Sequence, residues 1–567
     1  MNRNVESHFA LNPTNIDIRR STFDRSHSLK TSFNVGDIVP FFLDEVLPGD
    51  TFNVDTSKVV RLQTLLTPVM DNIYLDTYFF FVPNRLTWSH WKQFNGENTE
   101  SAWIPQTEYE IPQITAPADA GWSVGTIADY LGVPTGVPNL SVSALPFRAY
   151  ALVMNEWFRD ENLSDPLVVP VDDATVAGVN TGTFVTDVCK GGLPYKAAKY
   201  HDYFTSCLPS PQKGPDVLIP VAEAGNYPVV ALSDPVPSSL YPQAKAHWGR
   251  PDNGEYYTAA NPFGSITGNA SNASLSFSTP DFGVSASSGP LNPLNLWAVS
   301  SGNAAAATIN QLRMAFQIQK LYEKDARGGS RYIEILKSHF GVTSPDARLQ
   351  RPEYLGGNRV PININQVVQQ SATASGETAQ GTVTGMSVTT DTHSDFTKSF
   401  TEHGFVIGVM VARYDHTYQQ GLERFWSRKD RFDYYWPVFA NIGEQAVKNK
   451  EIYAQGPAQK DSAGNVIDDQ VFGYQEAWAD YRYKPSRVTG EMRSQYAQSL
   501  DVWHLADDYS ALPMLSDSWI REDKANVDRV LAVTSAVSNQ LFADIYIKNR
   551  TTRPMPMYSI PGLIDHH

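Results

Sequence analysis

The sequence predicts a mainly β protein whose strands come from both ends of the chain. The 567 residues include 37 Pro, 37 Gly, 27 Tyr and 27 Phe, a composition that suits strands joined by elaborate loops. Alternating apolar patterns occur near the start and again near the end, whereas the clear helical patterns lie between them. A sheet that draws strands from both ends needs pairing between distant segments. The material between them must therefore form insertions or a second domain.

The chain is expected to begin with an extended arm, residues 1–30, followed by one large domain over residues 31–567. The arm has few apolar positions in any regular period. Its charged residues are the cations Arg3, Arg19, Arg20, Arg25 and Lys30 and the acids Glu6, Asp17 and Asp24.

Strand patterns follow the arm. KVVRLQTLL, residues 58–66, places apolar side chains at alternate positions, which predicts one buried face. NIYLDTYFFFVP, residues 72–83, alternates in the same way, but its second face also becomes apolar toward its end. It therefore predicts a strand that is covered on both sides. Two late strands are predicted in EHGFVIGVMVARYDH, residues 402–416, and SNQLFADIYIKNR, residues 538–550.

Three segments between these strands have the spacing of helices. LPFRAYALVMNEWFRDEN, residues 145–162, repeats apolar side chains every three or four positions, as a buried helical stripe does. Residues 307–329 repeat this pattern of a buried stripe and end at Gly328 and Gly329, a pair suited to a left-handed C-cap. A shorter helix is predicted over RYIEILKSHF, residues 331–340.

The composition also excludes several classes of protein. No window approaches the ~18 apolar residues of a membrane helix, and the N-terminus lacks the apolar core of a signal peptide. We therefore expect a soluble chain that stays where it is made. Cys189 and Cys207 fit a reducing cytosol, and we interpret both as small buried hydrophobic residues. The formal net charge of -15 argues against a histone-like coat on nucleic acid but does not exclude one basic face.

No short motif predicts catalysis, a cofactor or a metal site. The sequence has no P-loop, no GxGxxG, no HExxH and no GxSxG. His393, His403 and His416 lie among carboxylates, but a strand between the last two would hold them apart, so we interpret them as surface or loop histidines. A glycosidase-type pair of carboxylates stays open as an alternative. A helix-turn-helix reader is disfavoured, because the helix predicted over residues 331–340 mixes charges and has no clean phosphate-facing side.

The segment FWSRKDRFDYYWP, residues 425–437, is the strongest candidate for a binding site. It crowds six rings into thirteen positions together with three cations, and a fourth cation precedes it. Rings stack on unpaired bases and cations neutralise phosphate, as a single-stranded polyanion requires. Two alternatives stay open: an aromatic core covered by arginine stems, and a contact between subunits. The candidate contact residues are Arg424, Trp426, Arg428, Lys429 and Arg431.

Longer blocks of the sequence resemble a known family. The chain is similar to the major capsid protein of the gokushovirus branch of the microviruses, which are small tailless icosahedral bacteriophages with circular single-stranded DNA. The likeness runs in order from about residue 7 to the C-terminus and is weak only in insertions, such as residues 214–300. Blocks that carry it include RSTFDRSHSLKTSFNVGDIVPFFLDEVLPGDTF, DTYFFFVPNRLTWSHWKQFNGE, KYHDYFTSCLPSPQKG, EKDARGGSRYIEILKSHFGVTSPDARLQRPEYLGG and VFGYQEAWADYRYKPSRVTGEMR.

The resemblance implies a single jelly-roll viral β-barrel, with eight antiparallel strands in two sheets and long insertions that carry helices and surface loops. It implies that sixty copies assemble into a T=1 icosahedral shell around the single-stranded DNA genome. Further partners would be minor capsid or DNA-pilot proteins and a bacterial surface receptor, without membrane insertion. The protein would be a structural component of the virion, assembled in the host bacterial cytoplasm, with no cofactor and no enzymatic activity.

Two more sets of candidate residues can be named, one from the resemblance and one from the positive charge near the C-terminus. Residues 214–300 are expected to form a variable insertion that protrudes near the threefold axes. Residues 251–312 lack Lys, Arg and His, as suits a surface that faces the host and not the genome. The protrusion candidates are Asn269, Ser271, Asn272, Phe277 and Phe282, and further DNA-contact candidates are Lys548, Arg550 and Arg553.

Two rival functions stay open beside the capsid interpretation. A cytosolic β-rich carbohydrate-active enzyme would fit the many aromatic residues and the free carboxylates. A non-assembling single-stranded nucleic-acid-binding protein would bind DNA as a monomer with a steep salt dependence.

Overall fold

The computed structural model describes residues 19–97, 108–217, 309–343, 346, 349–371 and 379–558, together with four short strands between residues 229 and 298. The chain divides into two units. The first unit comprises Met1–Lys213 and Glu323–His567, and the second comprises Gly214–Tyr322.

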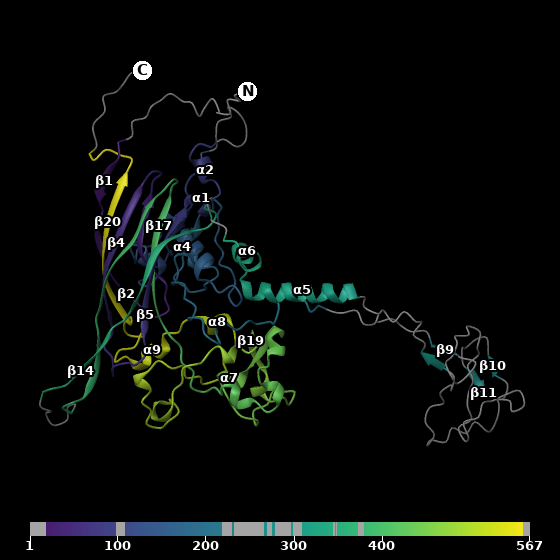
Figure 1. Ribbon diagram of the computed structural model, residues 1–567. Helices are drawn as coiled ribbons and strands as arrows, with labels where there is room; N and C mark the ends of the chain where they lie inside the picture. The colour runs from purple at the N-terminus through teal and green to yellow at the C-terminus, as the bar shows by residue number, and fades with distance from the viewer. Residues whose placement is uncertain are drawn as a thin grey trace, which may run out of the picture. The chain divides into compact units, whose positions relative to one another are not determined.

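The first unit is built on two antiparallel sheets (Figure 1). The strand order is β1-β20-β4-β16 in the first sheet, where β2 also pairs with β20, and β13-β5-β17-β3 in the second. The strands of the first sheet are β1 (Ser21–Asp24), β2 (His27–Phe33), β4 (Thr51–Leu62), β16 (Thr389–Ser399) and β20 (Leu541–Arg553). Those of the second sheet are β3 (Val39–Val46), β5 (Ile73–Pro83), β13 (Glu353–Pro361) and β17 (Gly404–Tyr414).

The order of these strands is that of a jelly roll. If β2, β3, β4, β5, β13, β16, β17 and β20 are counted as the first to the eighth strand, one sheet has the order 1-8-3-6 and the other 5-4-7-2. The last long strand pairs with β4 along its length, from Leu541 opposite Leu62 to Thr552 opposite Thr51. The predicted mainly β fold, with antiparallel strands drawn from both ends of the chain, is confirmed.

The main hydrophobic core lies between the two sheets. Phe79 of β5 is fully buried, and its ring centroid lies 5.3 Å from that of Phe41, 5.8 Å from that of Phe42 and 5.3 Å from that of Phe396. The first two rings belong to β3 in the same sheet, whereas Phe396 belongs to β16 in the other sheet. One aromatic group therefore joins both layers of the sandwich.

A second core covers the other face of the second sheet. Phe80 and Ile407, from β5 and β17, pack in one buried cluster with Phe147 and Tyr150 of α4 (Leu145–Val153). The hydroxyl of Tyr150 donates a hydrogen bond of 2.6 Å to the backbone carbonyl of Ile38. Both faces of β5 are buried, so the prediction of a strand covered on both sides is confirmed.

The predicted helices are present, with one difference in burial. The helix of α4 continues as a π-helical turn, Met154–Phe158. Gly329 has φ +91° directly after α5 (Ile309–Gly328), as predicted for a left-handed cap. The buried stripe predicted for α5 is wrong, because Ile309 and Phe316 are 69% and 55% exposed. A helical period marks an amphipathic helix but does not identify the element that will cover it.

Shorter elements complete the described fold. The short helices are α1 (Asn84–Thr87), α2 (Trp91–Phe94), α3 (Ile127–Tyr130), α6 (Tyr332–Phe340), α7 (Asn449–Ile452), α8 (Asp517–Ile520) and α9 (Ala525–Val530). The short strands of the first unit are β6 (Gln113–Thr115), β7 (Ser141–Ser143), β8 (Val176–Ala177), β14 (Ile364–Val368), β15 (Val383–Ser387), β18 (Glu444–Lys448) and β19 (Val471–Glu476). Cys189 and Cys207 are buried and unpaired, as predicted.

The second unit contains the predicted surface insertion, of which the structure describes four short strands. In it, β9 (Val229–Ala231) pairs with β12 (Leu296–Ala298), and β10 (Ile266–Gly268) pairs with β11 (Leu275–Phe277), both antiparallel. Of the protrusion candidates, Phe277 is the last residue of β11. The candidates outside the described residues are Asn269, Ser271, Asn272 and Phe282.

Residues 1–18 of the predicted N-terminal arm also lie outside the described residues. The remainder of the arm forms β1 and the first part of β2, and both strands pair with β20. The beginning and the end of the chain therefore meet in the first sheet.

A buried charged cluster lies where the chain leaves β17. The ring nitrogens of His416 lie 2.9 Å from a carboxylate oxygen of Asp507 and 3.0 Å from one of Glu522, and Lys199 lies 3.6 Å from Asp507. The His416 side chain is 1% exposed. His416 lies in a loop, as predicted, but its side chain is not on the surface. The partners that bury it lie 91 and 106 positions further along the chain, so the local sequence does not reveal them.

This cluster predicts a loss of stability at alkaline pH. Burial alone would lower the pKa of His416, but the charges and hydrogen bonds of Glu522 and Asp507 raise it from 6.5 to about 9. Because the pKa is higher in the folded chain, the stabilisation is complete below pH 6.5 and is lost as the pH rises through about 9. At about 1.36 kcal/mol per pKa unit, the loss is roughly 3 kcal/mol.

Urea unfolding of the purified chain at about pH 7 and about pH 10 measures this loss. His416→Gln is the control, since glutamine has no proton to release in this range, and its free energy of unfolding should fall by roughly 3 kcal/mol less than that of the unchanged chain. Equal losses in the two proteins would contradict the assignment of the alkaline transition to His416.

Candidate nucleic-acid interface

The candidate segment stands on a small core of its own. The chain leaves the second sheet after Tyr414, and Tyr418 packs with Phe204, Val447, Ile452 and Phe472 in a third buried cluster. Of these residues, Val447 belongs to β18, Ile452 to α7 and Phe472 to β19. This core supports residues 425–437, whose aromatic side chains remain on the surface.

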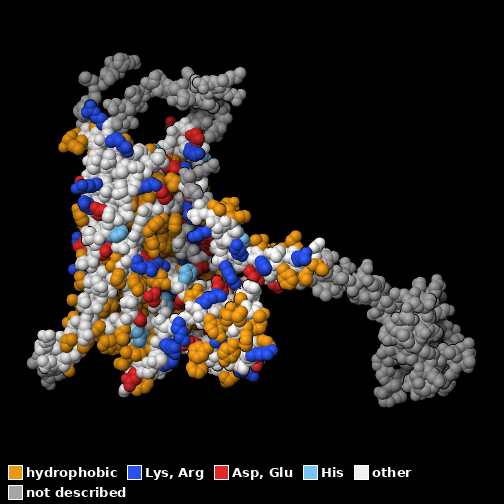
Figure 2. All heavy atoms as spheres, viewed as in Figure 1, with side chains coloured by type: hydrophobic (Ala, Val, Ile, Leu, Met, Phe, Trp, Pro, Cys, Tyr) orange, Lys and Arg blue, Asp and Glu red, His pale blue; other side chains and the backbone are white. Residues whose placement is uncertain are grey.

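Six rings of this segment are exposed. Residues 424–441 include three 3₁₀ turns, and six rings in and between these turns are 40–66% exposed. We call this feature the aromatic–cationic surface; it consists of Phe425, Trp426, Phe432, Tyr434, Tyr435 and Trp436 with Lys429 and Arg431. The alternative of an aromatic core covered by arginine stems is therefore wrong. Figure 2 shows hydrophobic side chains gathered, with Lys and Arg beside them, on the part of the first unit that carries α7 and β19.

Arg424 points inward and braces the segment. Its guanidinium lies 3.6 Å from the carboxylate of Glu451, which is almost fully buried, and donates a hydrogen bond of 2.9 Å to the backbone carbonyl of Ala446. Burial raises the pKa of the Glu451 carboxyl, and the charge of Arg424 opposes this rise. The charge of Arg424 is thus committed to an internal partner.

Arg428 is a second internal brace. It forms an ion pair with Asp480, and both side chains are nearly buried. Its guanidinium also lies 4.3 Å from the centroid of the Tyr481 ring and 5.5 Å from that of Tyr434. These contacts hold residues 425–437 against the segment that follows β19.

Lys429 and Arg431 differ from these braces. Both are exposed, and neither forms an ion pair with a side chain that the structure describes. The guanidinium of Arg431 lies 4.7 Å from the ring of Phe432. The backbone N–H groups of Asp430 and Lys429 bond to Asp433 and lower the pKa of its carboxyl. The exposed cations therefore stand beside exposed rings on a fixed turn.

The C-terminal candidates lie elsewhere, on β20 in the first sheet. Lys548 and Arg550 are exposed, and the ammonium of Lys548 lies 3.3 Å from Asp55. Arg553 is held by Asp50 at 3.0 Å and donates a hydrogen bond of 2.6 Å to the backbone carbonyl of Glu45. Figure 1 shows β20 well apart from α7 and β19, so these residues are not brought together with the aromatic–cationic surface.

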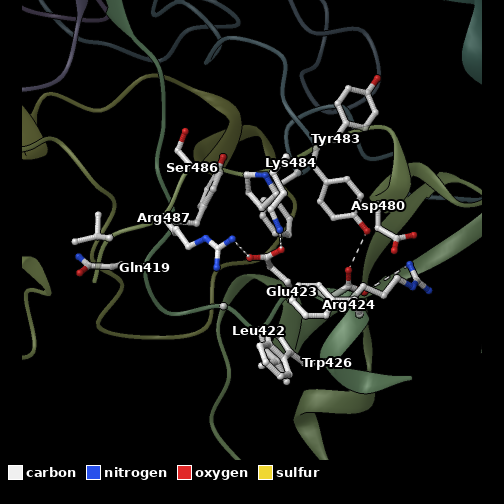
Figure 3. Close-up of a pocket in the computed structure, with 18 of the residues that line it drawn as sticks. Gln419, Leu422, Glu423, Arg424, Trp426, Asp480, Tyr483, Lys484, Ser486 and Arg487 are labelled. Carbon is white, nitrogen blue, oxygen red and sulfur yellow. Dashed lines mark hydrogen bonds and ion pairs between the residues drawn. The ribbon is translucent and has the colours of Figure 1, made fainter. Parts of the chain in front are cut away.

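The sequence analysis missed a second segment of the site, residues 480–493. It lies across a cavity of about 510 Å³ from residues 419–428. Tyr483, Lys484 and Arg487 are about half exposed or more at this cavity. The signal was present in YRYKPSR, where rings alternate with cations. Figure 3 shows Lys484 and Arg487 both directed at the carboxylate of Glu423.

The described residues form neither a metal site nor a membrane-spanning helix. No cluster of three or more His, Cys, Asp or Glu side chains there has an arrangement that would hold a metal ion. Within the same residues, no helix combines the length and the apolar character needed to cross a membrane.

Comparison with known proteins assigns the family. A family model described as "Capsid protein (F protein)" of phages matches residues 13–563. The chain belongs to this capsid protein family. It is 44% identical to capsid protein VP1 of Chlamydia phage 1, over 99% of this chain and 98% of the relative. It is 41% identical to capsid protein VP1 of Bdellovibrio phage phiMH2K, over 99% and 98%, and 42% identical to that of Spiroplasma virus 4, over 96% of each chain.

The family match confirms the resemblance and the predicted role as a major capsid protein. This capsid protein family is structural and is not a family of enzymes, so the rival interpretation as a carbohydrate-active enzyme is excluded. Membership implies that copies of the chain assemble into a shell and places the protein in a virion.

Proposed function

We propose that sixty copies of this capsid protein form a T=1 icosahedral shell that encloses circular single-stranded DNA. The supporting observation is the full-length match to the capsid proteins of three phages, which covers 96–99% of the chain. Identical subunits close a shell through repeated interfaces whose rotation angles match. Assembly takes place in the host bacterial cytoplasm, with minor capsid or DNA-pilot proteins as further partners.

In this shell the aromatic–cationic surface faces the DNA. Trp426 is 66% exposed, and Lys429 and Arg431 lie on the same surface without internal carboxylate partners among the described residues. Exposed rings stack on unpaired bases without sequence preference, and exposed cations neutralise phosphate. Arg424 and Arg428 position this surface, because their charges are already paired. Many weak contacts hold the genome and still let it leave.

The positively charged positions on β20 form a second, weaker contact. Lys548 and Arg550 are exposed on the first sheet, but Lys548 has Asp55 beside it. Arg553 supports the end of β20 through Asp50 and is not free to turn toward a ligand.

Replacing Lys429 and Arg431 together with serine tests the DNA-facing surface. We expect the DNA content of purified particles to fall while the yield of empty shells is kept. For the full-length subunit and a labelled single-stranded oligonucleotide, the plot of log affinity against log salt should lose about 1.4 in slope, about 0.7 per phosphate contact. Fluorescence anisotropy at graded salt measures the slope, and absorbance of particles measures the DNA.

The matched control removes two exposed cations from α5, with Lys320→Ser and Lys324→Ser. This pair should leave DNA content and salt slope unchanged. Equal losses of DNA and of shells in the Lys429 and Arg431 variant would instead support a contact between subunits at this surface.

The surface insertion, residues 214–300, is proposed to present loops to a bacterial surface receptor. Deletion of residues 264–290 is expected to leave shell formation intact and to reduce adsorption of particles to host cells to near background. Particle yield after gradient sedimentation and the unadsorbed titre check the two parts separately. A deletion variant that does not assemble would refute this assignment of the insertion.

A further inference from the structure

The cavity between residues 419–428 and 480–493 carries more positive than negative side chains. Six cations and three carboxylates line its volume of about 510 Å³. Two of the carboxylates, Glu451 and Asp480, form pairs with Arg424 and Arg428 in the interior. The third carboxylate, Glu423, is the most exposed of the three.

Glu423 is placed between two cations. One oxygen forms an ion pair with the ammonium of Lys484, and the other lies 3.5 Å from the guanidinium of Arg487 (Figure 3). The Lys484 and Arg487 side chains are 61% and 57% exposed, whereas Glu423 is 19% exposed. Both cations therefore remain accessible while a single carboxylate neutralises them in part.

This arrangement matches the chemistry of a phosphodiester. A phosphodiester has one negative charge and two non-bridging oxygens, so it can offer one oxygen to each cation, as Glu423 does. Exchange of one anion for the other leaves the net charge between the two cations unchanged. The interaction of the phosphate with Lys484 and Arg487 would be little stronger than the interaction of Glu423 that it replaces, so binding would stay weak.

Rings lie at the same site to receive a base. The ammonium of Lys484 is 5.1 Å from the centroid of the Phe425 ring, and that ring is 4.7 Å from the Trp426 ring. Tyr483 is 49% exposed beside Lys484. A phosphate held between Lys484 and Arg487 thus has exposed rings within the reach of its neighbouring base.

We propose that a phosphodiester of single-stranded DNA displaces the carboxylate of Glu423 from Lys484 and Arg487, and that Glu423 competes with the phosphate so that the genome is held weakly. This inference rests on the proposed function, in which this face of the subunit meets DNA. In the subunit without DNA, Glu423 occupies the position that the phosphate would take and keeps the two cations in place. It thereby lowers the affinity of the site for DNA.

Glu423→Gln tests the competition, because glutamine keeps the size of the side chain and removes its charge. Fluorescence anisotropy of a labelled oligothymidylate with the full-length subunit should show about three- to tenfold tighter binding at low salt, with a salt slope steeper by up to about 0.7. The matched control is Glu491→Gln, which removes an exposed carboxylate of the same segment that does not line the cavity. Its binding should change by less than about twofold.

A second variant tests whether the tighter binding of Glu423→Gln depends on Lys484 and Arg487. When Glu423→Gln is combined with Lys484→Ser and Arg487→Ser, the gain should disappear. The inference is overturned if Glu423→Gln binds no tighter than Glu491→Gln, or if the gain persists without the two cations. It is also overturned if Glu423→Gln strengthens only the association of subunits, because the cations would then serve carboxylates of another copy.

The same assay separates this inference from the proposed function. Suppose that the Lys429 and Arg431 variant binds the oligothymidylate more weakly while Glu423→Gln binds as the unchanged chain does. That result would support the DNA-facing surface and refute the competition by Glu423. If neither variant changes binding, both the DNA-facing surface and the competition by Glu423 are refuted.

Discussion

Asp507→Ala is expected to lower the free energy of unfolding of the capsid subunit by about 3–5 kcal/mol, the cost of breaking a buried ion pair from one side. The substitution leaves His416 paired with Glu522 and leaves the buried ammonium of Lys199 without the Asp507 carboxylate. Burial alone would raise the pKa of Asp507, but His416 and Lys199 hold it well below its ordinary value, so the carboxylate is charged at neutral pH. Urea unfolding of the subunit at about pH 7 measures the loss.

The effect of Asp507→Ala should extend to the candidate site. The backbone N–H of Asp507 donates a hydrogen bond of 2.8 Å to the carbonyl of Thr417, in the connection that leads from β17 to the aromatic–cationic surface. Asp508→Ala is the matched control, since Asp508 is exposed and makes one hydrogen bond of 3.1 Å to Gln420. Its cost should stay below about 1 kcal/mol. Similar costs for the two variants would show that the buried charges do not stabilise this junction.

Phe79→Ala should cost about 3–5 kcal/mol of unfolding free energy, because it opens a cavity where both sheets meet. The ring is fully buried and lies against Phe41 and Phe42 in its own sheet and against Phe396 in the other. Relaxation around the cavity is limited, since the second core holds the opposite face of β5. Urea unfolding of the subunit is again the measurement.

Tyr546→Ala provides the comparison for Phe79→Ala, because Tyr546 is 49% exposed on β20. Its removal should change the free energy of unfolding by about 0.5 kcal/mol or less. If Phe79→Ala proved as mild as Tyr546→Ala, the two sheets would not share the tightly packed core described above.

The strands were predictable because their signal is local. Alternation along β20 and the apolar second face of β5 follow from which side chains each strand buries, and both are visible within a dozen residues. The register was not predictable, since Leu541 and Leu62 are neighbours only through the complete topology. The burial of α5 was not predictable either: its helical period was identified, but its apolar side chains are exposed.

The candidate site was predicted in part for the same reason. The crowding of rings and cations in residues 425–437 is local, and the structure places these rings on the surface. The pairing of Arg428 with Asp480, 52 positions away, is not local, and it distinguishes an internal brace from an exposed cation. The role of Glu423 depends in the same way on Lys484 and Arg487.

An electron cryomicroscopy reconstruction of the assembled particle tests the central claim most directly. The account predicts a closed shell of sixty subunits in which Trp426, Lys429 and Arg431 lie on the inner surface, with nucleic-acid density against them. A shell in which these side chains point outward or are buried between subunits, or a protein that forms no hollow particle, would contradict it.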